Sequence, residues 1–148
     1  MISRALSSFS LRKSRSRCLV THIPNCLHDK NSVPVTVSRS PSEIDKWIST
    51  YVSSTKSDFI GFDIEWRPTY RSGEKQPKAA TIQLATPQAA LIAQLSHMNS
   101  TPTSIVDTLG DDQLVKVGVG VKGDLTRLKK DYNLAYAGFS DIVDIEVL

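Results

Sequence analysis

The amino-acid sequence predicts a single α/β domain, in which helices flank a mixed β-sheet. Three short apolar runs follow one another closely in the middle of the chain, and helix-like and strand-like segments alternate after them. Successive strands followed by such alternation are typical of antiparallel strands joined to parallel ones in one sheet. The length of 148 residues is enough for one hydrophobic core and short for two domains.

The first thirty residues differ from the rest of the chain. Residues 1–28 hold five of the 18 Lys and Arg and none of the 15 Asp and Glu, and they are rich in Ser. We therefore interpret residues 1–30 as a basic leader, disordered or targeting, and residues 33–148 as the domain. Such a composition is typical of a mitochondrial or plastid address, while the basic run 12–17 is equally compatible with a nuclear localisation patch.

The net charge of +3 comes from this leader, because residues 1–28 carry +5 and the remainder carries −2. The charge alone is therefore no argument for a basic nucleic-acid-binding face. No stretch approaches the roughly 20 consecutive apolar residues that cross a bilayer, so no membrane partner is expected.

The domain begins with an expected strand and helix. Valines alternate over residues 33–37, as in a strand, and residues 42–53 form an amphipathic helix that Ser40 or Ser42 is placed to cap. The apolar face of this helix has the spacing of a helix packed on a sheet. It consists of Ile44, Trp47, Ile48 and Tyr51.

The remaining segments continue the mixed pattern. The three apolar runs predict strands over 59–66, 79–85 and 89–95. After them we expect a helix over 103–109, a strand over 114–121, a helix over 124–133 and a strand over 141–147.

The first candidate functional motif lies in the strand over 59–66. Side chains alternate between the faces of a strand, so Asp63 and Glu65 project from the face opposite Phe62, Ile64 and Trp66. Their α-carbons should lie about 6.6 to 6.8 Å apart, near enough for both carboxylates to coordinate one divalent cation or to bridge two. Alternation is also common in half-exposed strands, but two adjacent carboxylates in a central strand repel each other and favour a cation.

A second motif joins the strand over 114–121 to the following helix, which Asp124 opens. Its glycines, Gly118, Gly120 and Gly123, spell Gly-x-Gly-x-x-Gly after a strand and before a helix, as in dinucleotide-binding proteins. Against that alternative, a pyrophosphate would sit at the helix N-terminus, where Asp124 already places a negative charge. A metal site uses all three carboxylates, whereas a plain N-cap role would account for Asp124 alone.

Three blocks in this order resemble the 3'-5' exonucleases typified by the exonuclease domain of the Werner syndrome helicase and by ribonuclease D. The blocks are residues 61–66, 79–85 and 116–128. The resemblance covers residues 33–148 and implies a ribonuclease H-like fold. It also implies two Mg²⁺ or Mn²⁺ ions held by carboxylates, with Asp63, Glu65 and Asp124 as catalytic metal ligands, and removal of nucleotides from the 3' end of DNA or RNA.

Residues just after the first motif are candidates for substrate binding. Trp66 and Tyr70 are aromatic and suited to stacking on bases, and Arg67 is suited to neutralising phosphate. A charged loop is equally often only solvated.

The third motif of the family, Tyr-x-x-x-Asp or His-x-x-x-Asp, does not occur after Asp124. One of the four expected carboxylates is therefore missing. We accordingly expect a domain that is incomplete at its C-terminus, with reduced or no activity as this chain. A non-catalytic nucleic-acid-binding module is the second functional hypothesis, and the dinucleotide-binding domain is the third.

Overall fold

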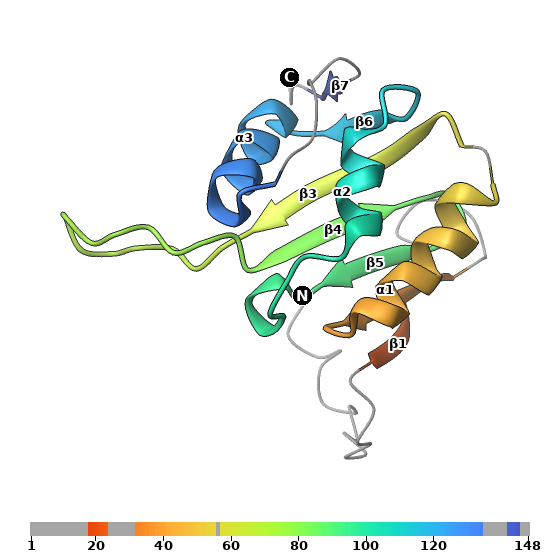
Figure 1. Cartoon of the computed structure of the whole chain (residues 1–148), viewed down its shortest axis with the longest axis horizontal. Helices are drawn as coiled ribbons and strands as arrows, with labels where there is room; N and C mark the ends of the chain where they lie inside the picture. Colours follow the sequence, from red (N-terminus) through yellow and green to blue (C-terminus); the bar gives the residue numbers. More distant parts are fainter. Residues whose placement is uncertain (1–17, 24–31, 56, 135–141, 146–148) are drawn as a thin grey trace, which may run out of the picture.

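The computed structural model describes residues 18–23, 32–55, 57–134 and 142–145. Its centre is a seven-stranded sheet with the order β1-β2-β5-β4-β3-β6-β7 (Figure 1). The strands are β1 Cys18–Ile23, β2 Val33–Ser38, β3 Phe59–Glu65, β4 Thr81–Ala85, β5 Ala90–Ala93, β6 Val115–Gly118 and β7 Ile142–Asp144.

The sheet is mixed, as the sequence predicts. Strands β3, β4 and β5 form an antiparallel meander, while β6 runs parallel to β3 and β7 runs parallel to β6. On the other side, β2 runs parallel to β5 and pairs with β1 in the antiparallel sense. This arrangement puts β3 in the interior of the sheet, between β4 and β6.

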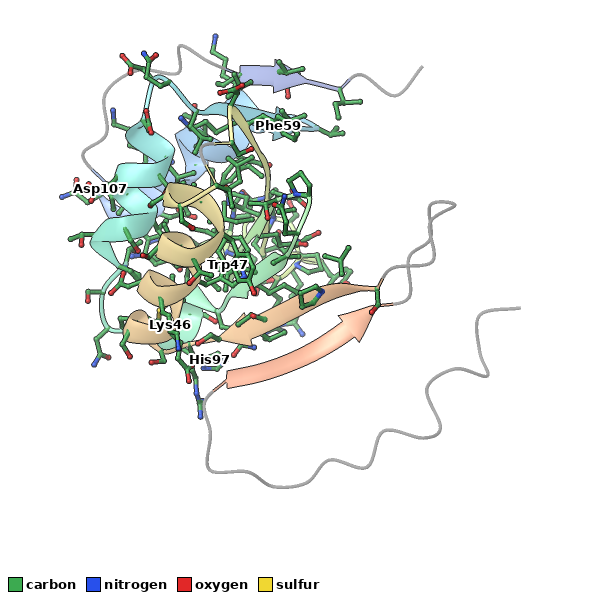
Figure 2. All side chains as sticks on the ribbon, turned by 90° about the vertical axis from the view of Figure 1, so that its right-hand side faces the viewer. Lys46, Trp47, Phe59, His97 and Asp107 are labelled. Atoms are coloured by element: carbon green, nitrogen blue, oxygen red, sulfur yellow. The ribbon has the colours of Figure 1, made fainter. Side chains whose placement is uncertain are left out.

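The helices of the described residues lie on one side of the sheet, as the view turned by 90° shows (Figure 2). They are α1 Pro41–Ile48, which continues as a π-helix over Ser49–Ser53, α2 Thr103–Gly110 and α3 Val121–Tyr132, with a 3-10 turn at Leu95–His97. None of these helices is long and apolar enough to cross a membrane, within the part of the chain that is described.

Alternate residues of the strands supply the core beneath these helices. In β3, Ile60, Phe62 and Ile64 are buried, whereas the residues between them are exposed or half-buried. The helices contribute Ile44, Trp47, Ile48, Ile105, Leu109, Val121, Leu125 and Leu128 to the same cluster. The predicted apolar face of α1 is therefore confirmed, with Tyr51 half-buried against it.

The structure corrects two predicted helix starts in detail. Ser40 is the N-cap residue of α1, one of the two predicted positions, but its side chain makes no capping hydrogen bond, because its hydroxyl pairs with that of Ser42 at 3.1 Å. Helix α3 begins at Val121 instead of Asp124, because Gly120 adopts a φ of 69° that ends the extended chain. The predicted strand over 114–121 is therefore shorter, and β6 ends at Gly118 although valines continue beyond it.

Strand β1 lies in the segment that the sequence assigned to the leader. Its backbone pairs residue by residue with β2, from Cys18 opposite Ser38 to Ile23 opposite Val33. The sequence predicted no strand there, because its hydrophobic pattern is short and embedded in a basic, Ser-rich context. The rest of the predicted leader, and the ends of the predicted strand over 141–147, lie outside the described residues.

Candidate metal and nucleic-acid site

The interior position of β3 determines where its two carboxylates point. Asp63 and Glu65 are exposed, while Phe62 and Ile64 between them are 3% and 2% exposed. The predicted division of the strand into an acidic and an apolar face is thus confirmed. Because the described helices cover the apolar face, the acidic face is the open side of the sheet.

A close approach between β3 and β6 brings the second motif to the first. A Cβ on Gly118 would lie 2.3 Å from the carbonyl oxygen of Phe62, so only glycine fits at this point of the β6 strand. The chain then turns at Gly120 and enters α3, whose first turn carries Asp124. Asp124 is therefore within the helix, donating its backbone N–H to the Gly120 carbonyl at 3.1 Å, and is not the N-cap.

The charges of the other two predicted carboxylates, Asp63 and Glu65, reach Asp124. Partial burial raises the pKa of Asp124 from its ordinary value of 3.8 to about 6, and the negative charges of Asp63 and Glu65 add to this increase. The guanidinium of Arg127 opposes the shift, and Asp144 contributes to it weakly. The structure thus brings together residues that are about sixty positions apart in the sequence.

The donor set fits a hard divalent cation, because it consists of carboxylate oxygens, which Mg²⁺ and Mn²⁺ prefer. As the side chains stand, no three Asp, Glu, His or Cys groups within the described ranges surround one point where an ion fits. Asp63 explains part of this, since its Oδ1 accepts the backbone N–H of Ile64 at 2.9 Å and its Oδ2 accepts Gln83 at 3.5 Å. A shared cation would have to draw the Asp63 carboxylate away from these partners.

Asp144 is a residue of this region whose place the sequence did not reveal. Its Oδ1 accepts the backbone N–H of Val121 at 2.7 Å, so it neutralises the partial positive charge at the N-terminus of α3. The contact depends on β7 returning beside β6, and no local pattern in the sequence indicates it.

Backbone geometry accounts for the glycines that suggested a dinucleotide site. Gly118 allows the close strand approach and Gly120 provides the left-handed turn, while Gly123 has open space around it. The first N–H of α3 is occupied by a carboxylate instead of being available for a pyrophosphate. These positions therefore need no bound dinucleotide to explain them.

The β3–β4 loop, residues 66–80, holds the three predicted substrate-binding residues and extends away from the sheet (Figure 1). Trp66 is half-buried and packs against the core, and one face of its ring is covered by Arg127, whose Cζ lies 3.9 Å from the ring centroid. Arg67 is exposed, and Tyr70 is 85% exposed. A substrate contact by each of them stays a prediction.

Arg127 of α3 clamps both arms of this loop. Besides covering Trp66 on the outgoing arm, its guanidinium donates to Gln76 Oε1 at 2.8 Å and to the Pro77 carbonyl at 2.6 Å on the returning arm. Its Nε lies 3.5 Å from Asp131 Oδ2, one helical turn further along. The helix that carries Asp124 therefore also sets the position of the loop.

Replacing Arg127 by Met should release the loop while keeping most of the side-chain volume. We expect the free energy of unfolding to fall by about 1 to 2 kcal/mol, because two charged hydrogen bonds and the cation–π contact are lost at a partly solvated site. Limited trypsinolysis should then cut faster after Arg71 and Lys75. Lys130→Met, on the exposed side of the same helix, is the control; equal cleavage rates for both variants would contradict the clamp.

Replacing Asp124 by Asn should stabilise the protein at neutral pH. The folded-state pKa of about 6 exceeds the ordinary 3.8, so the folded state binds the proton more tightly and stability falls as pH rises through this window. Allowing for partial solvent exposure, we expect a gain of about 1 to 2 kcal/mol at pH 7 that vanishes near pH 4. Urea denaturation across this range measures it, and a loss of stability at pH 7 would contradict the mutual repulsion.

Comparisons with known proteins agree with this architecture. Residues 35–146 match the family model described as 3'-5' exonuclease. The chain is 32% identical over 115 residues to a 3'-5' exonuclease of Arabidopsis thaliana, covering 73% of this chain and 40% of that protein. It is 32% identical over 89 residues to the bifunctional 3'-5' exonuclease/ATP-dependent helicase WRN of Mus musculus, covering 60% of this chain and 6% of that protein.

The fold is similar to that of a solved relative. The crystal structure of the EXD2 exonuclease domain superimposes with a TM-score of 0.61 at 26% identity, over 74% of this chain and 56% of that one. The predicted ribonuclease H-like α/β fold is therefore confirmed, and the chain spans about half of the matched domain. The extent of the family match, together with the carboxylates on an interior strand, establishes that this chain belongs to the 3'-5' exonuclease family.

Proposed function

We propose that this chain is a divalent-metal-dependent 3'-5' exonuclease domain in which Asp63, Glu65 and Asp124 hold Mg²⁺ or Mn²⁺. The observation that carries the proposal is the position of Asp63 and Glu65 on the exposed face of the interior strand β3, with Asp124 near enough for their charges to raise its pKa further. Carboxylates that repel one another are stabilised by a shared cation. Crystals of the EXD2 exonuclease domain, 25% identical to this chain, were soaked in Mn and in Mn with dGMP.

A metal held by Asp63, Glu65 and Asp124 would supply activation of water and stabilisation of the leaving 3' oxygen. The residues of this chain position the metal and the substrate strand. Asp63 and Glu65 face the open side of the sheet, where a nucleic acid strand can approach. Asp124, in the first turn of α3, is near enough for their charges to raise its pKa. Arg67 and Tyr70 on the β3–β4 loop, and the Trp66 indole at its base, are proposed to contact the DNA or RNA strand whose 3' end is cut.

The chain itself supplies three of the carboxylates of such a site, Asp63, Glu65 and Asp124. A second candidate is a module that binds nucleic acid without cutting it, which would use the exposed Arg67 and Tyr70 of the β3–β4 loop. The two functions differ in turnover. Binding that is insensitive to Asp124→Ala, without release of product, supports the module.

The test follows the shortening of a 5'-labelled oligonucleotide, with Mn²⁺ or with EDTA. Mn²⁺-dependent shortening from the 3' end supports the exonuclease. Shortening that is indifferent to EDTA, or a protein whose melting temperature does not respond to Mn²⁺ at all, would overturn the metal site.

A further inference from the structure

A hollow of about 600 Å³ lies at the base of the β3–β4 loop, apart from the carboxylates. Its walls come from three segments: both arms of the loop, the 3-10 turn after β5, and the last turn of α3. The polar and charged residues that line it are Arg67, Lys78, Ser96, Asn99 and Tyr132.

The charge of this hollow is entirely positive. Arg67 and Lys78 line it, and none of its lining residues is acidic. Ser96 and Asn99, both exposed, add neutral hydrogen-bonding groups. A site with two cations, neutral donors and no carboxylate favours an anionic ligand with several oxygen acceptors.

The walls are held in place by contacts across the loop. Asp131 Oδ2 accepts the backbone N–H of Ala79 at 2.8 Å, and the Tyr132 hydroxyl donates to the Ala79 carbonyl. Lys78 Nζ lies 5.3 Å from the centroid of the Tyr132 ring, where a cation–π attraction favours it. The hollow is therefore formed before any ligand arrives, which lowers the entropic cost of binding.

The hollow lies next to the elements that carry the carboxylates, β3 and α3. The N–H of Ala80, on its wall, donates to the carbonyl of Glu65 at 2.7 Å, so the hollow begins where β3 ends. Asp124 and Tyr132 stand eight residues apart on α3, which is about 12 Å along the helix axis. A stacked strand rising about 3.4 Å per nucleotide covers this distance in roughly three to four nucleotides.

We propose that this hollow binds the phosphodiester backbone of the substrate strand, a few nucleotides on the 5' side of the terminal nucleotide. The inference rests on the proposed exonuclease function and adds a second contact point to it. Lys78 and Arg67 provide its two positive charges. Such a contact holds the strand in register without reading its sequence.

The test measures the affinity of a short 5'-labelled oligothymidylate by fluorescence anisotropy, in EDTA to prevent turnover, over a series of salt concentrations. Replacing Lys78 by Met should weaken binding at low salt about threefold to tenfold and reduce the slope of log affinity against log salt by about 0.7, the value of one lost phosphate contact. Lys78→Arg should keep the slope of the wild type.

Lys46→Met is the matched control, because Lys46 is exposed on α1 and does not line the hollow (Figure 2). An unchanged slope for Lys78→Met, or an equal reduction for Lys46→Met, would overturn the inference. The melting temperature with and without Mn²⁺ is measured on the same variants. A normal Mn²⁺ response beside an unchanged slope rejects the hollow alone, whereas a missing Mn²⁺ response in the wild type rejects the metal site.

Discussion

Replacing Gly118 by Ala is expected to destabilise the protein by about 3 kcal/mol or more. The added Cβ would lie 2.3 Å from the Phe62 carbonyl oxygen and 3.0 Å from a methyl of Val121. The first neighbour is backbone of an interior strand held on both sides by ladder hydrogen bonds, so it cannot move aside cheaply. Relief requires β6 to separate from β3, which also displaces the start of α3.

Gly123→Ala provides a matched control for this prediction. Gly123 lies in the first turn of α3, and a Cβ there would meet nothing within 4 Å. We expect a neutral effect or a gain of up to about 1 kcal/mol, since Ala favours the helix. Urea denaturation measures both variants, and a Gly118→Ala protein within about 0.5 kcal/mol of the wild type would show that the strands are not in such close contact.

Replacing Asp63 by Ala should abolish stabilisation by Mn²⁺. At an ion concentration about one hundred times the dissociation constant, binding adds about 2.7 kcal/mol to the wild type, which corresponds to an increase of several degrees in melting temperature. Asp63 is exposed in the apo protein, and its removal also relieves the repulsion on Asp124. The apo variant should therefore fold normally while the Mn²⁺-dependent increase disappears.

Asp107→Ala controls for nonspecific ion binding, because Asp107 is exposed on α2 and points away from the sheet (Figure 2). Its Mn²⁺ response should equal that of the wild type. Calorimetric titration of Mn²⁺ into Asp63→Ala, Asp107→Ala and the wild type then counts the sites. An Asp63→Ala protein that keeps the full response would remove Asp63 from the ligand set.

The features that the sequence predicted correctly depend on local alternation. Phe62 and Ile64 are buried, while Asp63 and Glu65 are exposed on the other face of the strand. This alternation follows from the two-residue period of a strand and does not depend on other segments. The apolar face of α1 follows in the same way from helical spacing. The interior place of β3 was expected because apolar runs flank it.

The features that the sequence did not reveal depend on contacts between distant segments. Pairing of β1 with β2 rests on backbone hydrogen bonds, which leave no side-chain pattern in the sequence. The contact of Asp144 with Val121 and the clamp formed by Arg127 each join elements far apart in the chain. Gly120 marks the start of α3 through its backbone angle, which composition does not specify.

Helix α3 connects the two places where ligands are proposed to bind. Its first turn carries Asp124 and its later turns hold the loop through Arg127 and Tyr132. If a bound cation shifted this helix, the β3–β4 loop would move with it. If a bound nucleic acid strand shifted the loop, the helix would carry the Asp124 carboxylate with it. Any such coupling is reciprocal, so the factor by which Mn²⁺ strengthens oligonucleotide binding must equal the factor by which the oligonucleotide strengthens Mn²⁺ binding.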